Sequence, residues 1–140
     1  MSLAQTDGGE SAVLNVRQLL FDQGLIGCPD WHDITLEEQE AGPAIQVLRL
    51  NSDAGIAFFV TDPFPIMMDY AFEISDSDAK ALELLDSSEA LVLVILTIVN
   101  ESPTVTANML GPLVVNIRTG RGQQLVLTNS DYSVRHSVTI

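Results

Sequence analysis

The feature that most limits the fold of this chain is a series of short apolar runs, separated by turn residues and not alternating with helices. Ile45–Leu50 alternates imperfectly between apolar and polar side chains, as a half-buried strand does. Gly55–Thr61 and Ala90–Val99 are almost continuously apolar and rich in β-branched or aromatic residues, which predicts buried strands. This pattern excludes a parallel βαβ architecture and predicts a small antiparallel, barrel-like or sandwich domain that is mainly β.

The segments between these runs agree with that architecture. We expect further strands at residues 12–21, 69–74, 106–110, 113–117, 124–127 and 132–136, giving about eight strands. Gly120 and Gly122 join two of them into a predicted hairpin. One short helix is expected over about residues 76–85, because Ser75 or Ser77 can cap it and acidic residues occupy its first turn. Its apolar face is expected to include Ala79, Leu82 and Leu85.

The length and apolar content of the chain indicate one folded domain. A chain of 140 residues can bury a substantial core, and 46% apolar residues are too many for a disordered protein. Ala90–Val99 is about half as long as a membrane-spanning helix needs to be, and no secretory signal is visible. We therefore expect a single domain over residues 11–140, preceded by a flexible N-terminus or vector-derived remnant over residues 1–10.

The charge of the chain restricts its partners. Nineteen acidic residues face six basic ones, which gives a net charge of −13. Phosphate groups are repelled by such a field, so nucleic acid and anionic membranes are poor partners and a basic protein is a good one. The alternative is that the charge only keeps the domain soluble.

Residues that could carry chemistry are few. Cys28 is the only cysteine and has no basic neighbour in sequence that would lower its pKa, so we expect a structural role. Cys28 and His32 lack the second pair of ligands that a zinc site requires, and no phosphate-binding glycine motif occurs. His32 or His136 could belong to a hydrolase triad, but no GxSxG motif marks a nucleophile. We expect no enzyme activity, no metal and no cofactor.

Five stretches, in order, resemble the motifs of a known family. They are Phe21–Gly27 (FDQGLIG), Ile56–Tyr70 (IAFFVTDPFPIMMDY), Thr106–Asn116 (TANMLGPLVVN), Gly122–Leu127 (GQQLVL) and Tyr132–His136 (YSVRH). In this order and spacing, over about residues 12–138, they resemble the FliW flagellar assembly factor family. The sequence departs from the family pattern at Asp22, Ile26, Cys28 and Met67-Met68, and Leu3–Gly9 lacks the usual aromatic first strand.

The resemblance implies a barrel-like β fold and a cytoplasmic protein with two competing protein partners. One is flagellin, bound before export in a chaperone-like way. The other is CsrA, a small basic RNA-binding regulator that represses flagellin translation. When flagellin leaves, the freed protein captures CsrA and translation resumes. The net charge of −13 suits a basic regulator electrostatically.

Two sets of residues are candidates for partner binding. The first lies in the loop after the second apolar run and consists of Asp62, Phe64, Met67, Met68, Asp69 and Tyr70; its adaptable apolar side chains suit an amphipathic segment of flagellin. The alternative is that Pro63 and Phe64 are only a turn and a core residue. The second set lies on the helix and its exit and consists of Asp76, Asp78, Glu83, Asp86 and Glu89, which could dock a basic regulator or could form only a solvated face.

Other polar residues are expected to serve the fold. Asn108, Pro112 and Asn116 are expected to be architectural, and Arg135 to pair with one of the many acids. Two alternative functions remain open at this point. One is a diverged relative that binds another cytosolic protein, and the other is a small hydrolase that uses His32 or His136.

Overall fold

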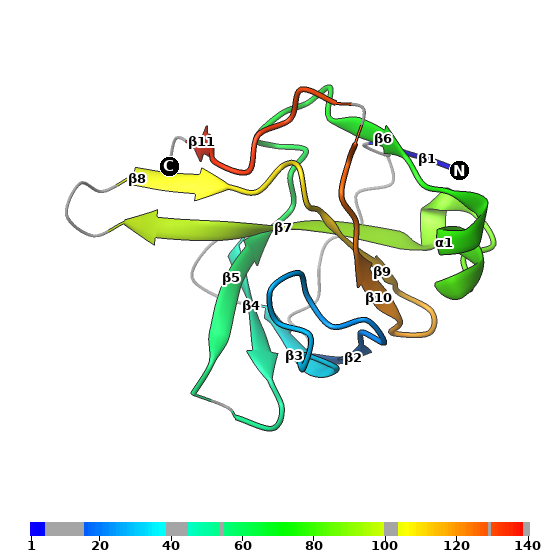
Figure 1. Cartoon of the computed structure of the whole chain (residues 1–140), viewed down its shortest axis with the longest axis horizontal. Helices are drawn as coiled ribbons and strands as arrows, with labels where there is room; N and C mark the ends of the chain where they lie inside the picture. Colours follow the sequence, from blue (N-terminus) through cyan, green and yellow to red (C-terminus); the bar gives the residue numbers. More distant parts are fainter. Residues whose placement is uncertain (5–15, 39–44, 54, 100–103, 129, 139–140) are drawn as a thin grey trace.

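The computed structural model of the chain describes residues 1–4, 16–38, 45–53, 55–99, 104–128 and 130–138. These residues form eleven strands, one short α-helix and one 3₁₀ turn (Figure 1). The strands are β1 (Ser2–Ala4), β2 (Val16–Leu20), β3 (Asp33–Glu38), β4 (Ile45–Leu50), β5 (Ala57–Thr61), β6 (Ala71–Glu73), β7 (Ala90–Val99), β8 (Thr104–Ala107), β9 (Leu113–Asn116), β10 (Gly122–Gln124) and β11 (His136–Val138). The helix is α1 (Asp76–Ala81) and the 3₁₀ turn is η1 (Ser87–Glu89).

Strand β7 is the central strand of the main sheet and pairs with β5, β8 and β9 (Figure 1). All pairings between the described strands are antiparallel. One edge of β7 pairs with β5, and the meander continues through β4 and β3 to β2. Its other edge carries β9 beside Ala90–Leu93 and β8 beside Leu96–Val99, so β8 and β9 follow each other along the same strand. The mainly β, antiparallel architecture with one short helix is therefore confirmed.

The main sheet curls until its far strand meets the β9–β10 hairpin. Leu20 in β2 donates its N–H to the carbonyl of Gly120 at 2.9 Å, and a single bridge joins Leu20 to Arg121. Gly120 has a φ of +80°, and a Cβ there would lie 2.8 Å from the carbonyl oxygen of Gln18. Only glycine allows both this turn and this close approach. The sheet is thus barrel-like and is held at this edge by one bridge.

Two hydrophobic clusters lie on opposite faces of β7. The inner cluster fills the curl of the sheet and includes Phe21, Trp31, Ile34, Leu48 and Leu93. The outer cluster lies between β7 and the layer formed by β1, β6 and α1, and includes Leu3, Tyr70, Phe72, Leu82 and Val94. Because β7 contributes to both clusters, its sequence is apolar at nearly every position rather than at alternate ones.

Several predicted strands are confirmed, and two strands were missed. The bounds predicted for β4 and β7 are those observed, and the β9–β10 hairpin forms as predicted. Strand β3 was not predicted because its acidic residues hid the alternation of Ile34 and Leu36, which are both buried. Strand β5 is central in the sheet as predicted but only partly buried: Val60 and Thr61 are buried, whereas Phe59 is 46% exposed.

The expectation of a flexible terminus is wrong for residues 1–4. These residues form β1, which pairs with β6, and Leu3 is buried against the outer cluster. The amino group of Met1 also donates a hydrogen bond to the carbonyl of Ile74 at 3.1 Å. Residues 5–10 of the predicted segment lie outside the described residues.

The helix begins where predicted but ends earlier than expected. The Ser75 hydroxyl accepts a hydrogen bond from the N–H of Asp78, which confirms the predicted cap. The helix stops after Ala81 because Glu83 adopts a left-handed φ of +57°. The N–H groups of Glu83 and Leu84 then bond to the carbonyls of Lys80 and Ala79, the pattern of a Schellman motif. Leu84, rather than the predicted Leu85, is consequently buried.

Candidate functional site

The first predicted loop contributes more to the core than to the surface. Phe64 and Tyr70 are buried in the outer cluster, and the Tyr70 hydroxyl donates a 2.6 Å hydrogen bond to the carbonyl of Met109. Burial raises the pKa of Tyr70 above its usual range. Asp62 is half-buried and accepts a hydrogen bond from the Phe64 N–H; burial raises its pKa, and that bond opposes the rise. These three side chains hold the loop in place.

Within the same loop, only part of the predicted set is accessible. Met68 is 76% exposed, and the Asp69 side chain is also exposed. Met67 is half-buried against the outer cluster. A partner could therefore reach Met68 and Asp69 directly, whereas it could reach Phe64 and Tyr70 only if the core opened.

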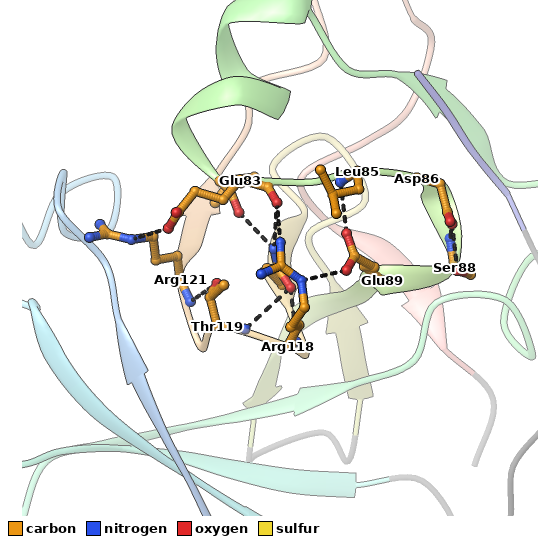
Figure 2. Close-up of polar contacts among 10 residues, drawn as sticks. Glu83, Leu85, Asp86, Ser88, Glu89, Arg118, Thr119 and Arg121 are labelled. Atoms are coloured by element: carbon orange, nitrogen blue, oxygen red, sulfur yellow. Dashed lines mark hydrogen bonds and ion pairs between the residues drawn. The ribbon is translucent and has the colours of Figure 1, made fainter.

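The acidic residues after the helix belong to a network that we call the helix latch, defined by Glu83, Glu89, Asn116, Arg118 and Arg121. The carboxylate of Glu89 accepts from the Arg118 Nε at 2.6 Å and from the Leu85 N–H at 2.7 Å (Figure 2). The Leu85 N–H and Arg118 together hold the pKa of Glu89 below its usual range. Arg121 lies between two acids, 2.8 Å from Glu83 and 2.9 Å from Asp22.

Asn116 is the buried centre of the helix latch. Its Nδ2 donates to the carbonyls of Leu82 and Glu83, at 2.8 and 3.1 Å. Its Oδ1 accepts from the N–H groups of Arg118 and Thr119, which begin the turn of the β9–β10 hairpin. One side chain thus joins the end of α1 to that hairpin, which confirms the predicted architectural role of Asn116.

The remaining predicted acids differ in how far the fold already uses them. Asp78 accepts a hydrogen bond from the Gln123 Nε2 at 2.9 Å. Asp86 caps η1 through the Ser88 N–H and the Ser88 hydroxyl, and these bonds lower the pKa of Asp86. Asp76 is exposed, and its side chain has no hydrogen-bond or ion-pair partner within the described ranges. The Asp69 side chain likewise has no partner there, so among the predicted acids these two carboxylates are the most available to a partner.

The three residues considered as candidates for catalysis or metal binding are His32, His136 and Cys28, and the contacts described for them are structural ones. The His32 Nδ1 lies 3.0 Å from the carbonyl oxygen of Phe21, and His136 pairs with Ala107 in the sheet. Cys28 is half-buried and packs against the inner cluster. In the part of the chain that the structure describes, no group of three His, Cys, Asp or Glu side chains could hold a metal ion. The described helix is also too short to cross a membrane.

A groove of about 730 Å³ lies on the inner face of the sheet, at the end of β7 away from the helix latch. Its floor is formed by Phe58 of β5, Ile95 and Thr97 of β7, and Thr106 of β8. Its walls come from Ile26, from Val126 after β10, and from the segment before β11. Ile26, Val126 and Val134 are 60%, 57% and 52% exposed, so the walls offer apolar side chains to an occupant.

The only charged residue that lines the groove, among those the structure describes, is Arg135. We predicted an acid partner for Arg135, and this prediction is not met within the described segments, where no carboxylate pairs with its exposed guanidinium. The Arg135 backbone N–H, by contrast, is held by the Ser133 hydroxyl at 3.0 Å. The residues that line this groove come from separate segments of the chain, so no local sequence pattern predicts it.

A second polar residue of the groove has the architectural role that we predicted. Asn108 accepts a hydrogen bond from the Gly111 N–H at 2.9 Å and so shapes the turn between β8 and β9. The Gln124 Nε2 donates to the carbonyl of Gly111, and its Oε1 accepts from the Ile26 N–H. These bonds fix the wall at Ile26 against the β8–β9 turn. The groove is therefore built by a defined hydrogen-bond network.

Comparison with known proteins agrees with this fold and with the motifs. A protein-family model described as "FliW protein" matches residues 2–138. A flagellar assembly factor FliW from Pseudothermotoga lettingae is 32% identical over 135 residues, covering 96% of this chain and 86% of the relative. Another from Thermoanaerobacter pseudethanolicus is 31% identical over 122 residues, covering 86% and 81%.

A solved structure supports the same assignment. The crystal structure of a flagellar assembly factor FliW superposes with a TM-score of 0.80 at 25% sequence identity, covering 86% of this chain and 84% of the other. The family match spans nearly the whole chain, and the relatives share both its sequence and its fold. The chain belongs to the FliW family of flagellar assembly factors.

Proposed function

We propose that this protein acts in the cytoplasm by binding two proteins in turn and by catalysing no reaction. In this proposal it binds flagellin before export and captures a CsrA-type translational repressor when flagellin is absent. Capture of the repressor relieves the repression of flagellin synthesis. The proposal rests on membership of the FliW family and on the acidic character of the chain.

The observation that carries the proposal is the net charge of −13 on a member of a flagellar assembly family. A small basic regulator is attracted to such a protein, and the attraction accelerates its association. Six basic residues are too few to neutralise nineteen acids, and three of the arginines are already paired with acids of the fold. The excess of carboxylates is therefore available to an external cation.

Fewer of the five acids predicted on the helix and its exit are available to a partner than their number suggests. Glu83 and Glu89 are neutralised by Arg121 and Arg118, so they add little net charge toward a partner. Asp69 and Asp76 have no such partner within the described part of the chain. We propose that these two residues provide the contact charge for the regulator, and that Met68 lies at the edge of the contact.

A matched pair of charge reversals tests this surface. The double variant Asp69→Lys/Asp76→Lys should weaken binding of the CsrA homologue from the same genome by roughly tenfold, or about 1.4 kcal/mol. The control is Asp30→Lys/Asp131→Lys, which changes the net charge equally at two other exposed positions. Isothermal titration calorimetry at 50 mM and 300 mM salt measures the affinity of both double variants for the regulator. Equal loss in the two variants would show that only the overall charge matters, and no loss in either would reject the acidic mechanism.

Competition between the partners tests the switch itself. With labelled CsrA homologue bound to the protein, added monomeric flagellin from the same genome should release the label. The expected readout is a fall in fluorescence anisotropy with increasing flagellin. If the regulator binds and flagellin does not displace it, the two-partner switch is wrong. A protein that binds neither would instead belong to a diverged branch of the family with another partner.

A further inference from the structure

The groove has the opposite chemistry to the rest of the molecule. The chain as a whole carries nineteen acids, yet among the described residues none of the side chains that line the groove is acidic. Its single charge is the exposed guanidinium of Arg135, which no carboxylate of the described residues neutralises. In the helix latch, by contrast, Arg118 and Arg121 both lie within 3 Å of a carboxylate.

An unpaired arginine at an apolar groove determines which occupant fits. A basic segment would place like charge against Arg135, which is unfavourable when water is excluded. A purely apolar segment would desolvate the guanidinium without giving it a partner. An amphipathic segment that carries a carboxylate satisfies both the apolar walls and the arginine, because guanidinium and carboxylate can form two parallel hydrogen bonds.

We infer that the groove binds an amphipathic segment of flagellin, with its apolar side chains against Ile26, Val126 and Val134 and a carboxylate on Arg135. The inference rests on the proposed function, because it assigns one of the two proposed partners to this surface. The basic regulator is excluded from the groove by charge and is left to Asp76 on α1 and Asp69 in the loop before β6. The two partners would then bind to different surfaces.

The position of the groove agrees with this separation. Its floor is at Ile95 and Thr97, near the end of β7, whereas Asp76 of the proposed regulator surface begins α1. Figure 1 shows α1 and the β8–β11 pair at opposite ends of that strand. Competition between flagellin and the regulator would then depend on coupling between the two sites through the fold, and not on a shared contact residue.

Three single variants test the inference in the full chain. Arg135→Glu should weaken binding of flagellin from the same genome by roughly thirtyfold or more, since it replaces attraction of the carboxylate by repulsion. Val126→Asp should weaken it by roughly tenfold, because it places a charge on an apolar wall. Both side chains are exposed, so the fold should survive, and circular dichroism checks this. The regulator's affinity should not fall in either variant.

Two control variants match these changes outside the groove. Arg17→Glu makes the same charge change, and Val16→Asp makes the same apolar-to-acidic change at an exposed residue of β2. Both should bind flagellin like the wild-type protein.

Each other outcome overturns the inference. If the wild-type protein binds flagellin and the groove variants bind it equally well, the groove assignment fails while the proposed function stands. If the wild-type protein binds no flagellin, the proposed function fails and the inference fails with it. Loss of regulator binding would instead assign the groove to the regulator. A change in molar mass by light scattering would assign it to a second copy of this chain.

Discussion

The two ends of β7 differ in whether the charged side chains beside them are paired. At its start, the helix latch pairs Glu89 with Arg118 and Glu83 with Arg121 (Figure 2). The buried Asn116 joins the backbone of both segments. At its other end, the groove exposes apolar walls and leaves Arg135 without an acid partner among the described residues. The acid-rich end is thus the one whose charges serve the fold.

This difference shows why a count of charges does not locate a binding surface. A carboxylate that already pairs with an arginine of its own chain has less charge and fewer acceptor positions left for a partner. An unpaired charge beside exposed apolar side chains has no such limit. The residues that are few in the sequence, such as the arginines, can therefore be more informative about partners than the many acids.

The strongest way to test the structural role of the latch is to remove its centre. Asn116→Ala deletes two donors and one acceptor that serve four buried or partly buried backbone groups. We expect a loss of roughly 3 kcal/mol in the free energy of unfolding, because backbone groups are left unpaired away from water. Urea denaturation measures it.

Asn51→Ala is the control for this substitution. Asn51 is exposed, and among the described residues its side chain bonds only to the side chains of Thr35 and Gln18, so the loss should stay below about 0.5 kcal/mol. At urea concentrations where Asn116→Ala remains folded, flagellin should still bind in the groove. Similar losses of stability in the two variants would remove the distinction between a structural end and a binding end of β7.

The groove end can be tested through the two glycines beside its wall at Ile26. Gly24 and Gly27 both have positive φ, at +67° and +82°. A Cβ on Gly24 would lie 2.4 Å from the Pro29 carbonyl oxygen, whereas a Cβ on Gly27 would meet nothing within 4 Å. Gly24→Ala should therefore cost about 2–4 kcal/mol, and Gly27→Ala only about 1 kcal/mol for the backbone conformation.

Thermal unfolding followed by circular dichroism compares the two glycine variants directly. The expected order is wild type, then Gly27→Ala, then Gly24→Ala. Gly24→Ala should also bind flagellin more weakly, since the wall at Ile26 depends on this turn. Equal midpoints for the two variants would mean that the turn moves freely, and the groove would then not be a defined surface.

Much of the fold could be predicted from the sequence because its signals are local. The bounds of β4 and β7 follow from apolar runs, and the start of α1 follows from Ser75 and its acidic first turn. The end of α1 could not be predicted, because the carbonyl of the left-handed Glu83 accepts hydrogen bonds from Asn116 and Arg118, which lie more than thirty residues away. Strand β1 was missed because three residues carry too little pattern without their partner β6.

The candidate site was predicted less well, for a related reason. Phe64 and Tyr70 have the composition of a binding loop, and only the packing of the outer cluster shows that both are buried. The groove brings Ile26, Phe58 and Arg135 together from positions more than thirty residues apart. No local pattern marks such a set, since each residue is ordinary in its own segment. Long-range pairing, rather than composition, creates this surface.

The smallest expected effect on stability comes from Glu83, where two substitutions separate the cost of the backbone conformation from the contribution of the side chain. This residue is in a left-handed conformation that costs a non-glycine residue about 1 kcal/mol, and its carboxylate pairs with Arg121. Glu83→Ala keeps the conformational cost and loses the ion pair, whereas Glu83→Gly loses both. The glycine variant should therefore be more stable than the alanine variant by about 1 kcal/mol in urea denaturation.

Comparison of Glu83→Gly with the wild-type protein then measures what the Glu83 side chain contributes to the free energy of unfolding. The exposed ion pair with Arg121 contributes at most about 1 kcal/mol, so Glu83→Gly should lie within about 1 kcal/mol of wild type and should gain on it as salt rises. If the alanine variant is as stable as the glycine variant, the left-handed turn carries no cost. If both variants keep their stability but lose the regulator, Glu83 is itself a contact residue, and its ion pair with Arg121 does not keep it from a partner.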